Sequence, residues 1–273
     1  MNDIDANMAP EDLERLKWAT QHLEHPSLAA RLTSIVGTPI EIGIKLLPRP
    51  VYKSARSIAN LAISKALRAA VSPLRHDEEA DPRNHYYRVL AAGSGALGGL
   101  FGLYALPVEF GLSTTIMMRS IAEIARAEGE DIHSPEAQMA CMEVFALGGQ
   151  SEEDDAADTG YYGIRLALAW PVTHASHYIA RHGLVMDGAP ALVNLVSAVG
   201  SRFGVAVSQK MAAMIVPVIG AAGAAAVNLV FMSHYQEMAR GHFVVRGLER
   251  KYGPELVKEH YERFCCPDKA QTR

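Results

Sequence analysis

Cysteine, aromatic residues and net charge are all scarce in this chain of 273 residues. The three cysteines, Cys141 and the adjacent Cys265 and Cys266, provide neither a disulfide framework nor the spacing of a zinc site. Aromatic residues make up 7% of the chain, which disfavours an aromatic-rich β-sandwich. The net charge of −4 gives no global reason to expect a nucleic acid partner. These absences point to a protein of the reducing cytoplasm.

Alternating apolar and polar runs, which are typical of half-buried strands, are also missing, and nearly every segment reads as helix. Ser134-Pro135-Glu136, for example, joins a capping serine to a proline and an acid in the first turn. We expect Gly200 and Gly204 to interrupt the helix that Pro190 opens. The predicted fold is all-α, a multi-helix bundle. The acidic N-terminus lacks the basic start and apolar stretch of a secretory signal.

Two long uncharged runs raise the question of a membrane. Val89 to Val108 covers 20 residues and Met211 to Ser233 covers 23 residues. The eight strongly apolar side chains of the second run supply about −2 to −5 kcal/mol toward insertion, and proline, glycine and asparagine oppose it. The predicted fold therefore contains two glycine-rich apolar helical hairpins, and entry of these hairpins into lipid stays an open alternative.

The segment between Glu41 and Asp77 is basic, with seven lysines and arginines and no acid. Its polar residues recur at steps of three or four, which gives an amphipathic helix with a basic stripe. We interpret this segment as a contact for a membrane surface or a membrane-protein partner. The residues assigned to the contact are Lys45, Arg49, Lys53, Arg56, Lys65 and Arg68.

Motifs for cofactor or hydrolytic chemistry are weak or missing. Gly93, Gly95 and Gly98 match a dinucleotide-binding pattern, but no strand is expected before them, so we interpret them as helix-packing glycines. The chain lacks a G-x-S-x-G elbow and an H-E-x-x-H zinc helix. His174, His177 and His182 lack a carboxylate or thiolate at matching spacing. We expect no cofactor and no metal.

A second group of polar residues lies in or beside the apolar runs. Because buried charges are costly unless they are paired, these residues are candidates for a pocket, a conformational latch or a structural ion pair. A histidine one turn from a glutamate also suits general acid–base chemistry, although a polar face beside a buried hairpin explains it equally well. The candidate polar cluster is Glu109, Arg119, Asn228, His234, Glu237, Arg240 and His242.

Long ordered blocks of the chain resemble the EcsC protein family, which is mainly bacterial and is named for a member encoded beside an ABC transporter. The blocks are residues 37–48, LPVEFGLSTTIMMRSIAEIARAEGED (106–131), 143–149, 158–169 and 201–253. Positions that match the family signature are Pro107, Glu109, Arg119, Pro217, Gly220, Asn228, His234 and Arg240. The resemblance implies no catalytic set, and a peptidase label carried by some relatives finds no protease motif here.

Three functions therefore stand as hypotheses. The leading one is a non-enzymatic accessory protein, cytoplasmic or at the inner face of the membrane, linked to a membrane or an ABC transporter. The others are a peptidase-like hydrolase that uses a His/Glu cluster, and a lipid carrier lined by Met117, Met118, Met211 and Met214. The predicted organisation is an N-terminal helical extension (1–24), an EcsC-like helical domain (25–262) and a C-terminal tail (263–273).

Overall fold

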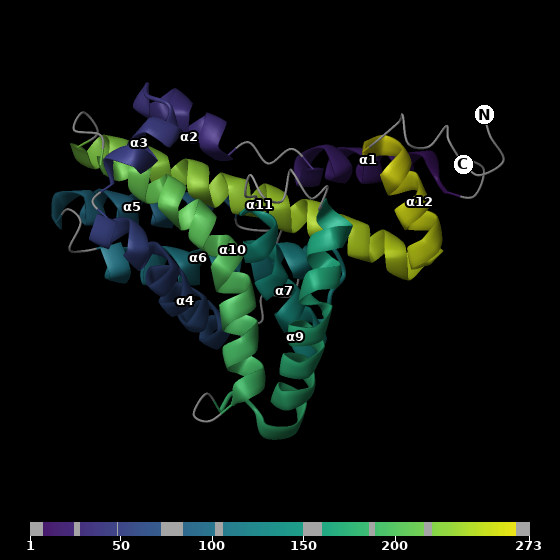
Figure 1. Cartoon of the computed structure of the whole chain (residues 1–273). Coiled ribbons are helices and arrows are strands. Elements are labelled where there is room, and N and C mark those ends of the chain that lie inside the picture. The colour runs from purple at the N-terminus through teal and green to yellow at the C-terminus, as the bar shows by residue number, and fades with distance from the viewer. Residues whose placement is uncertain are drawn as a thin grey trace.

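The computed structural model describes residues 8–24, 28–47, 49–71, 84–101, 106–149, 160–185, 189–215 and 220–265. Over these ranges the chain forms eleven α-helices and no strand, which confirms the predicted all-α fold. The helices, labelled as in Figure 1, are α1 (Pro10–Glu24), α2 (Leu28–Val36), α3 (Ile40–Leu46), α4 (Arg49–Val71), α5 (Asn84–Phe101), α6 (Leu106–Ala127), α7 (Pro135–Leu147), α9 (Tyr161–His182), α10 (Pro190–Ile215), α11 (Gly220–Tyr252) and α12 (Pro254–Cys265).

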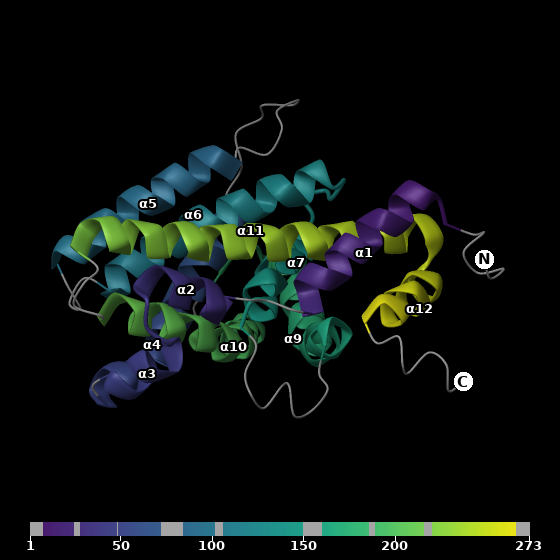
Figure 2. The ribbon, with the colours of Figure 1, turned by 90° about the horizontal axis from the view of Figure 1, so that it is seen from above.

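The longest helix, α11, has 33 residues and runs across the whole molecule. Figure 2 shows α5 beside one half of α11 and α1 beside the other half. Asn228 donates a hydrogen bond to the main-chain carbonyl of Ala91 on α5, at 2.9 Å. Near the other end, the Lys251 ammonium lies 2.7 Å from a carboxylate oxygen of Asp12 on α1. Polar contacts therefore tie α11 to the helices on which its apolar side chains pack.

A second group of helices, α4, α6 and α10, packs through small side chains. The buried face of α4 carries Ala55, Ala59, Ala62 and Ala66. The expectation that Gly200 and Gly204 interrupt α10 was wrong, because α10 is continuous from Pro190 to Ile215. A Cβ atom at Gly200 would lie 2.0 Å from Oδ1 of Asn60 on α4. The glycine therefore permits a close helix crossing within an unbroken helix.

Each uncharged run is divided between two helices. The run Met211 to Ser233 contains the end of α10 and the first part of α11, and Val89 to Val108 is shared by α5 and α6. The connecting residues 102–105 and 216–219 lie outside the described residues. In the described part of the chain one helix, Pro190–Met214, is long and apolar enough to cross a membrane, and half of its most apolar window is buried in the fold. Core helices of soluble proteins pass the same test, so this is weak evidence for a span.

Helix α1 packs against both α11 and α12. The predicted cap of α7 is confirmed, because the Ser134 hydroxyl accepts a hydrogen bond from the main-chain N–H of Ala137 at 3.2 Å. In Figure 1, α9 and the adjoining half of α10 extend away from the remaining helices as an antiparallel pair. Helix α7 packs against α11, and side chains from the first turns of α9 contact the C-terminal half of α11.

Candidate functional site

The residues of the candidate polar cluster lie in several separate environments. Glu109 and Asn228 are buried and hydrogen-bonded to each other at 2.8 Å. His234 is buried, and its Nε2 lies 3.0 Å from the main-chain carbonyl oxygen of Gly148. Arg119 is partly buried on α6. The sequence therefore identified buried polar residues, but the structure does not gather them into a single site.

The other three members of the predicted cluster point to further partners. Glu237 forms an ion pair with Arg31 on α2 at 2.6 Å. The exposed Arg240 guanidinium lies over the Trp18 ring on α1, 5.1 Å from its centroid. His242 is buried and contacts residues of α7 and α9. A catalytic cleft built from His234, Glu237 and His242 is therefore inconsistent with the structure.

Lys210 of α10, which was not predicted from the sequence, forms a buried ion pair with Glu109. Its Nζ lies 2.9 Å from Oε1 and 3.2 Å from Oε2 of the glutamate, and 3.5 Å from the Ser113 hydroxyl. The same nitrogen lies over the rings of Phe110 and Phe231, 4.4 and 4.9 Å from their centroids. A buried ammonium with this set of partners ties α10 to α6 and α11.

Burial lowers the pKa of Lys210, and the neighbouring Glu109 carboxylate opposes that shift. The carboxylate also accepts a hydrogen bond from the Asn228 amide, which in turn bonds to α5. Both charges therefore have close partners inside the fold. This set is best explained as a structural ion pair, with Asn228 as an additional hydrogen-bond donor.

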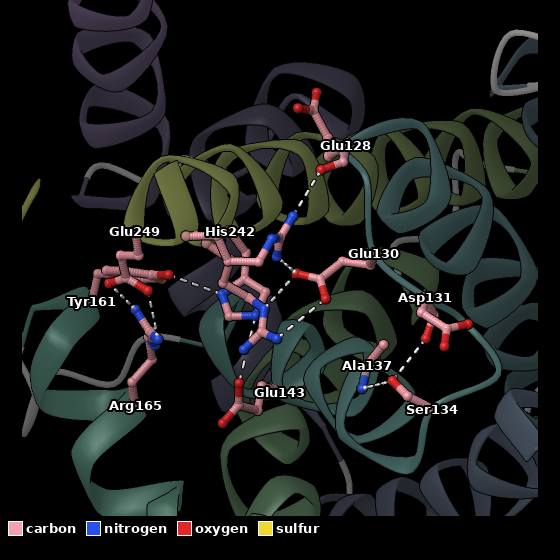
Figure 3. Close-up of polar contacts among 12 residues, drawn as sticks. Glu128, Glu130, Asp131, Ser134, Ala137, Glu143, Tyr161, Arg165, His242 and Glu249 are labelled. Carbon is pink, nitrogen blue, oxygen red and sulfur yellow. Dashed lines mark hydrogen bonds and ion pairs between the residues drawn. The ribbon is translucent and has the colours of Figure 1, made fainter. Parts of the chain in front are cut away.

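A second buried polar group lies between α7, α9 and α11. Figure 3 shows His242 between Tyr161 and Glu143. The Tyr161 hydroxyl is 3.0 Å from Nδ1 of His242, and Nε2 of the same ring is 3.5 Å from a carboxylate oxygen of Glu143. Burial, followed by the charges of Arg165 and Arg246, holds the pKa of His242 well below its usual value. The imidazole is therefore neutral at pH 7, and it places no positive charge beside Glu143.

Glu143 is 6% exposed, and its burial raises the pKa of its carboxyl to about 7. Two nearby arginines lower this pKa, and the carboxylate of Glu249 raises it. Arg165 binds both carboxylate oxygens of Glu249, at 2.7 and 3.0 Å, and Arg246 binds both oxygens of Glu130, at 2.8 and 3.3 Å. Since each arginine already has a carboxylate partner, Glu143 has the least compensated charge in this group.

His174 and His177 do not form a metal site with His182. His174 and His182 are exposed, and each is within hydrogen-bond distance of the main-chain carbonyl four residues earlier in α9. His177 is exposed as well. Among the described residues, no group of three or more histidine, cysteine or acidic side chains is placed to hold a metal ion. Cys141 is buried, which raises the pKa of its thiol to about 12, whereas Cys266 lies outside the described residues.

All six residues of the predicted membrane contact are exposed. Five of them lie along α4, where the apolar residues Ile58, Ala62, Ile63 and Ala66 are buried in the core. Large apolar side chains are exposed among these cations. We define the basic–apolar face as the exposed cations and exposed large apolar side chains of α3 and α4: Lys45, Arg49, Lys53, Arg56, Lys65, Arg68, Ile42, Leu46, Tyr52 and Leu61.

Lys210 and Glu143 were not predicted from the sequence. Lys210 has Ala206, Val207, Ala213 and Met214 at helical steps before and after it, so an apolar surrounding was visible in the sequence. Glu143 is likewise a lone charge in the apolar stretch from Met139 to Leu147. In both cases the spacing predicts burial, whereas the partner is set by a helix far away in the chain.

These features define an all-helical protein with a buried ion pair, a polar group between α7, α9 and α11, and an exposed basic–apolar face. The sequence profile of the EcsC protein family matches residues 12–248. The chain therefore belongs to the EcsC protein family. Comparisons with curated proteins and with solved structures find no match. The family match starts within α1 and ends before α12.

Proposed function

We propose that this protein is a non-enzymatic accessory protein that binds the anionic surface of a membrane through its basic–apolar face. The observation that carries the proposal is the exposure of all six predicted contact cations. No acidic residue occurs in the sequence between Glu41 and Asp77. Anionic lipid headgroups complement a basic protein surface of this kind. Each cation close to the headgroups contributes up to about 1 kcal/mol to the free energy of membrane binding.

Exposed apolar side chains support the same assignment. Leu46 is 65% exposed and Tyr52 is 52% exposed, and both lie close in sequence to Lys45, Arg49 and Lys53. Amphipathic membrane-surface helices combine cations with apolar and aromatic side chains that enter the headgroup layer. A surface that served only solubility would not require large apolar groups among its charges.

The proposal is tested by sedimentation with vesicles that contain phosphatidylserine, compared with vesicles of phosphatidylcholine alone. We expect the wild-type protein to bind the anionic vesicles and to be released by salt, because counter-ions screen surface charges. The double variant K53Q/R68Q removes two cations, so binding should weaken by roughly tenfold to thirtyfold, which corresponds to about 2 kcal/mol.

A matched control removes one lysine and one arginine from other exposed positions, in the variant K17Q/R181Q. This control has the same net charge as K53Q/R68Q, and it should retain most of the vesicle binding. If both variants lost vesicle binding to the same extent, the loss would result from net charge and not from the position of the cations. Failure of the wild-type protein to bind anionic vesicles would remove the proposal.

A membrane-protein partner, such as an ABC transporter, is proposed from the family alone, because the family is named for a member encoded beside an ABC transporter. The structure does not favour the hydrolase alternative, because His234, Glu237 and His242 have separate partners. The lipid-carrier hypothesis stays a prediction. Met117, Met118 and Met211 are buried in the core. Mass spectrometry of lipid that co-purifies with the protein would test it.

A further inference from the structure

A cavity of about 640 Å³ lies between α7, α9, α11 and the start of α12, built by helices other than those of the basic–apolar face. Ala140 of α7 and Leu166, Ala169 and Val172 of α9 contribute apolar surface to its wall. The cavity is of the size that small-molecule sites have, with apolar walls and a few polar groups. Its polar groups indicate which kind of molecule it accommodates.

Two polar side chains of the cavity wall, Glu143 and Ser176, are buried, and of the two only Glu143 is ionisable. This residue is 6% exposed and lines the cavity, and its close polar contact is with the neutral His242 ring at 3.5 Å. Carboxylates that are buried to this extent normally have several hydrogen-bond donors or a cation. The carboxyl therefore faces the cavity without the partners that its ionised form requires.

The cations around Glu143 are engaged elsewhere. Figure 3 shows Arg165 directed at Glu249, and Arg246 binds Glu130 through two of its nitrogens. The Tyr162 hydroxyl also donates to Glu249, at 3.1 Å. An anionic ligand would have to break one of these ion pairs and would meet the Glu143 carboxyl. A cationic ligand reaches Glu143 without breaking an ion pair, because Glu249 and Glu130 balance the charges of the two arginines. The third cation of the lining, Lys258 of α12, is exposed and pairs with Glu262 at 3.8 Å.

A second carboxyl lies on the same face of α7. Glu136 is seven residues before Glu143, which is nearly two helical turns or about 10.5 Å of rise, and it lines the cavity at an exposed position. It accepts a hydrogen bond from the Ser176 hydroxyl at 3.0 Å. The cavity thus offers one carboxyl at its base and another at its mouth, with apolar surface between them.

We propose that this cavity binds an aliphatic diamine or polyamine, with one ammonium group at Glu143 and another toward Glu136. The methylene chain of the ligand packs against the apolar wall from α9. Each ammonium group forms a charge-assisted hydrogen bond, and the inner one supplies the positive charge that Glu143 lacks. The site is independent of the basic–apolar face, so either proposal stands if the other fails.

The test is isothermal titration calorimetry of the full-length protein with cadaverine and spermidine. Two compounds of the cadaverine chain length serve as ligand controls, the neutral diol and the dianion glutarate. We expect the two amines to bind and the controls not to bind. E143Q keeps the shape of the side chain and should weaken amine binding at least tenfold, whereas E14Q, an exposed change on α1, should bind as the wild type does.

The affinity should also fall as the pH is lowered from 8 to 6, because the ammonium group requires the ionised form of Glu143. His242, Arg165, Arg246 and Glu249 face this carboxyl from α11 and α9, and of these the neutral His242 does not gain a proton in this range. The pH dependence should be lost in E143Q. Failure of both amines to bind, equal binding of the diol or glutarate, or equal affinities of E143Q and E14Q would each overturn the proposal.

Discussion

Replacing Lys210 by methionine removes one charge of the buried ion pair and keeps an unbranched apolar stem of similar length. In the wild type the ammonium contacts Glu109 at 2.9 Å, and both side chains are at most 3% exposed. In K210M the carboxylate retains the hydrogen bond from Asn228 but loses its cation. Removing one partner of a buried pair costs about 3–5 kcal/mol, because an uncompensated charge is left inside the fold.

The expected loss lies toward the lower end of that range. In the wild type the rings of Phe110 and Phe231 flank the ammonium. We expect the methionine sulfur to take that place, where sulfur–aromatic contacts recover about 0.3–1.5 kcal/mol. We therefore expect K210M to unfold with a free energy about 3 kcal/mol below that of the wild type. Urea titration followed by circular dichroism at pH 7 measures this quantity, and the slope of the titration should not change.

The double variant K210M/E109Q separates the ion pair from the packing. If the two charges stabilise each other, the double variant loses less stability than the sum of the single variants, by about 2 kcal/mol. K17M, an exposed change on α1, is the control for loss of a lysine and should stay within about 0.5 kcal/mol of the wild type. An additive double variant, or a loss below about 1 kcal/mol in K210M, would refute the reasoning.

Three further changes test other parts of the fold. Burial raises the pKa of Glu143 from 4.5 to about 7, so the folded state favours the protonated carboxyl. The stability that the protonated carboxyl provides is fully present below pH 4.5 and is lost as the pH rises through 7. In urea titrations, E143Q should have the same free energy of unfolding as the wild type at pH 4 and a value about 3 kcal/mol higher at pH 8. Equal free energies of unfolding at both pH values would contradict this. S134A removes the hydroxyl that accepts a hydrogen bond from the main-chain N–H of Ala137, and it should lower the free energy of unfolding by about 1 kcal/mol. An unchanged thermal denaturation curve would be the contrary result. G200A places a methyl group against Asn60 and should cost about 1–3 kcal/mol, a loss that N60A should partly restore if the close contact causes it.

Helix ends were predictable where local chemistry determines them. Ser134 and Pro135 begin α7, and Gly253 and Pro254 separate α11 from α12. Caps and prolines act within a single turn, so a short stretch of sequence contains the whole signal. The interruption expected at Gly200 was wrong because helix propensity is a weak preference that tertiary packing overrides. In α10 the glycine serves the contact with α4, and nothing near it in the sequence identifies that neighbour.

Glu143 and Lys210 mark the limit of what sequence can predict about the candidate sites. Each is a lone charge among apolar residues, so burial was foreseeable for both. Their surroundings nevertheless differ, because Lys210 meets a carboxylate on α6, whereas Glu143 meets a neutral histidine and a cavity. A charge whose partner lies within the protein is accounted for by folding alone. A charge that faces a cavity without such a partner leaves room for a ligand to complete its surroundings, and this difference makes Glu143 the stronger functional candidate.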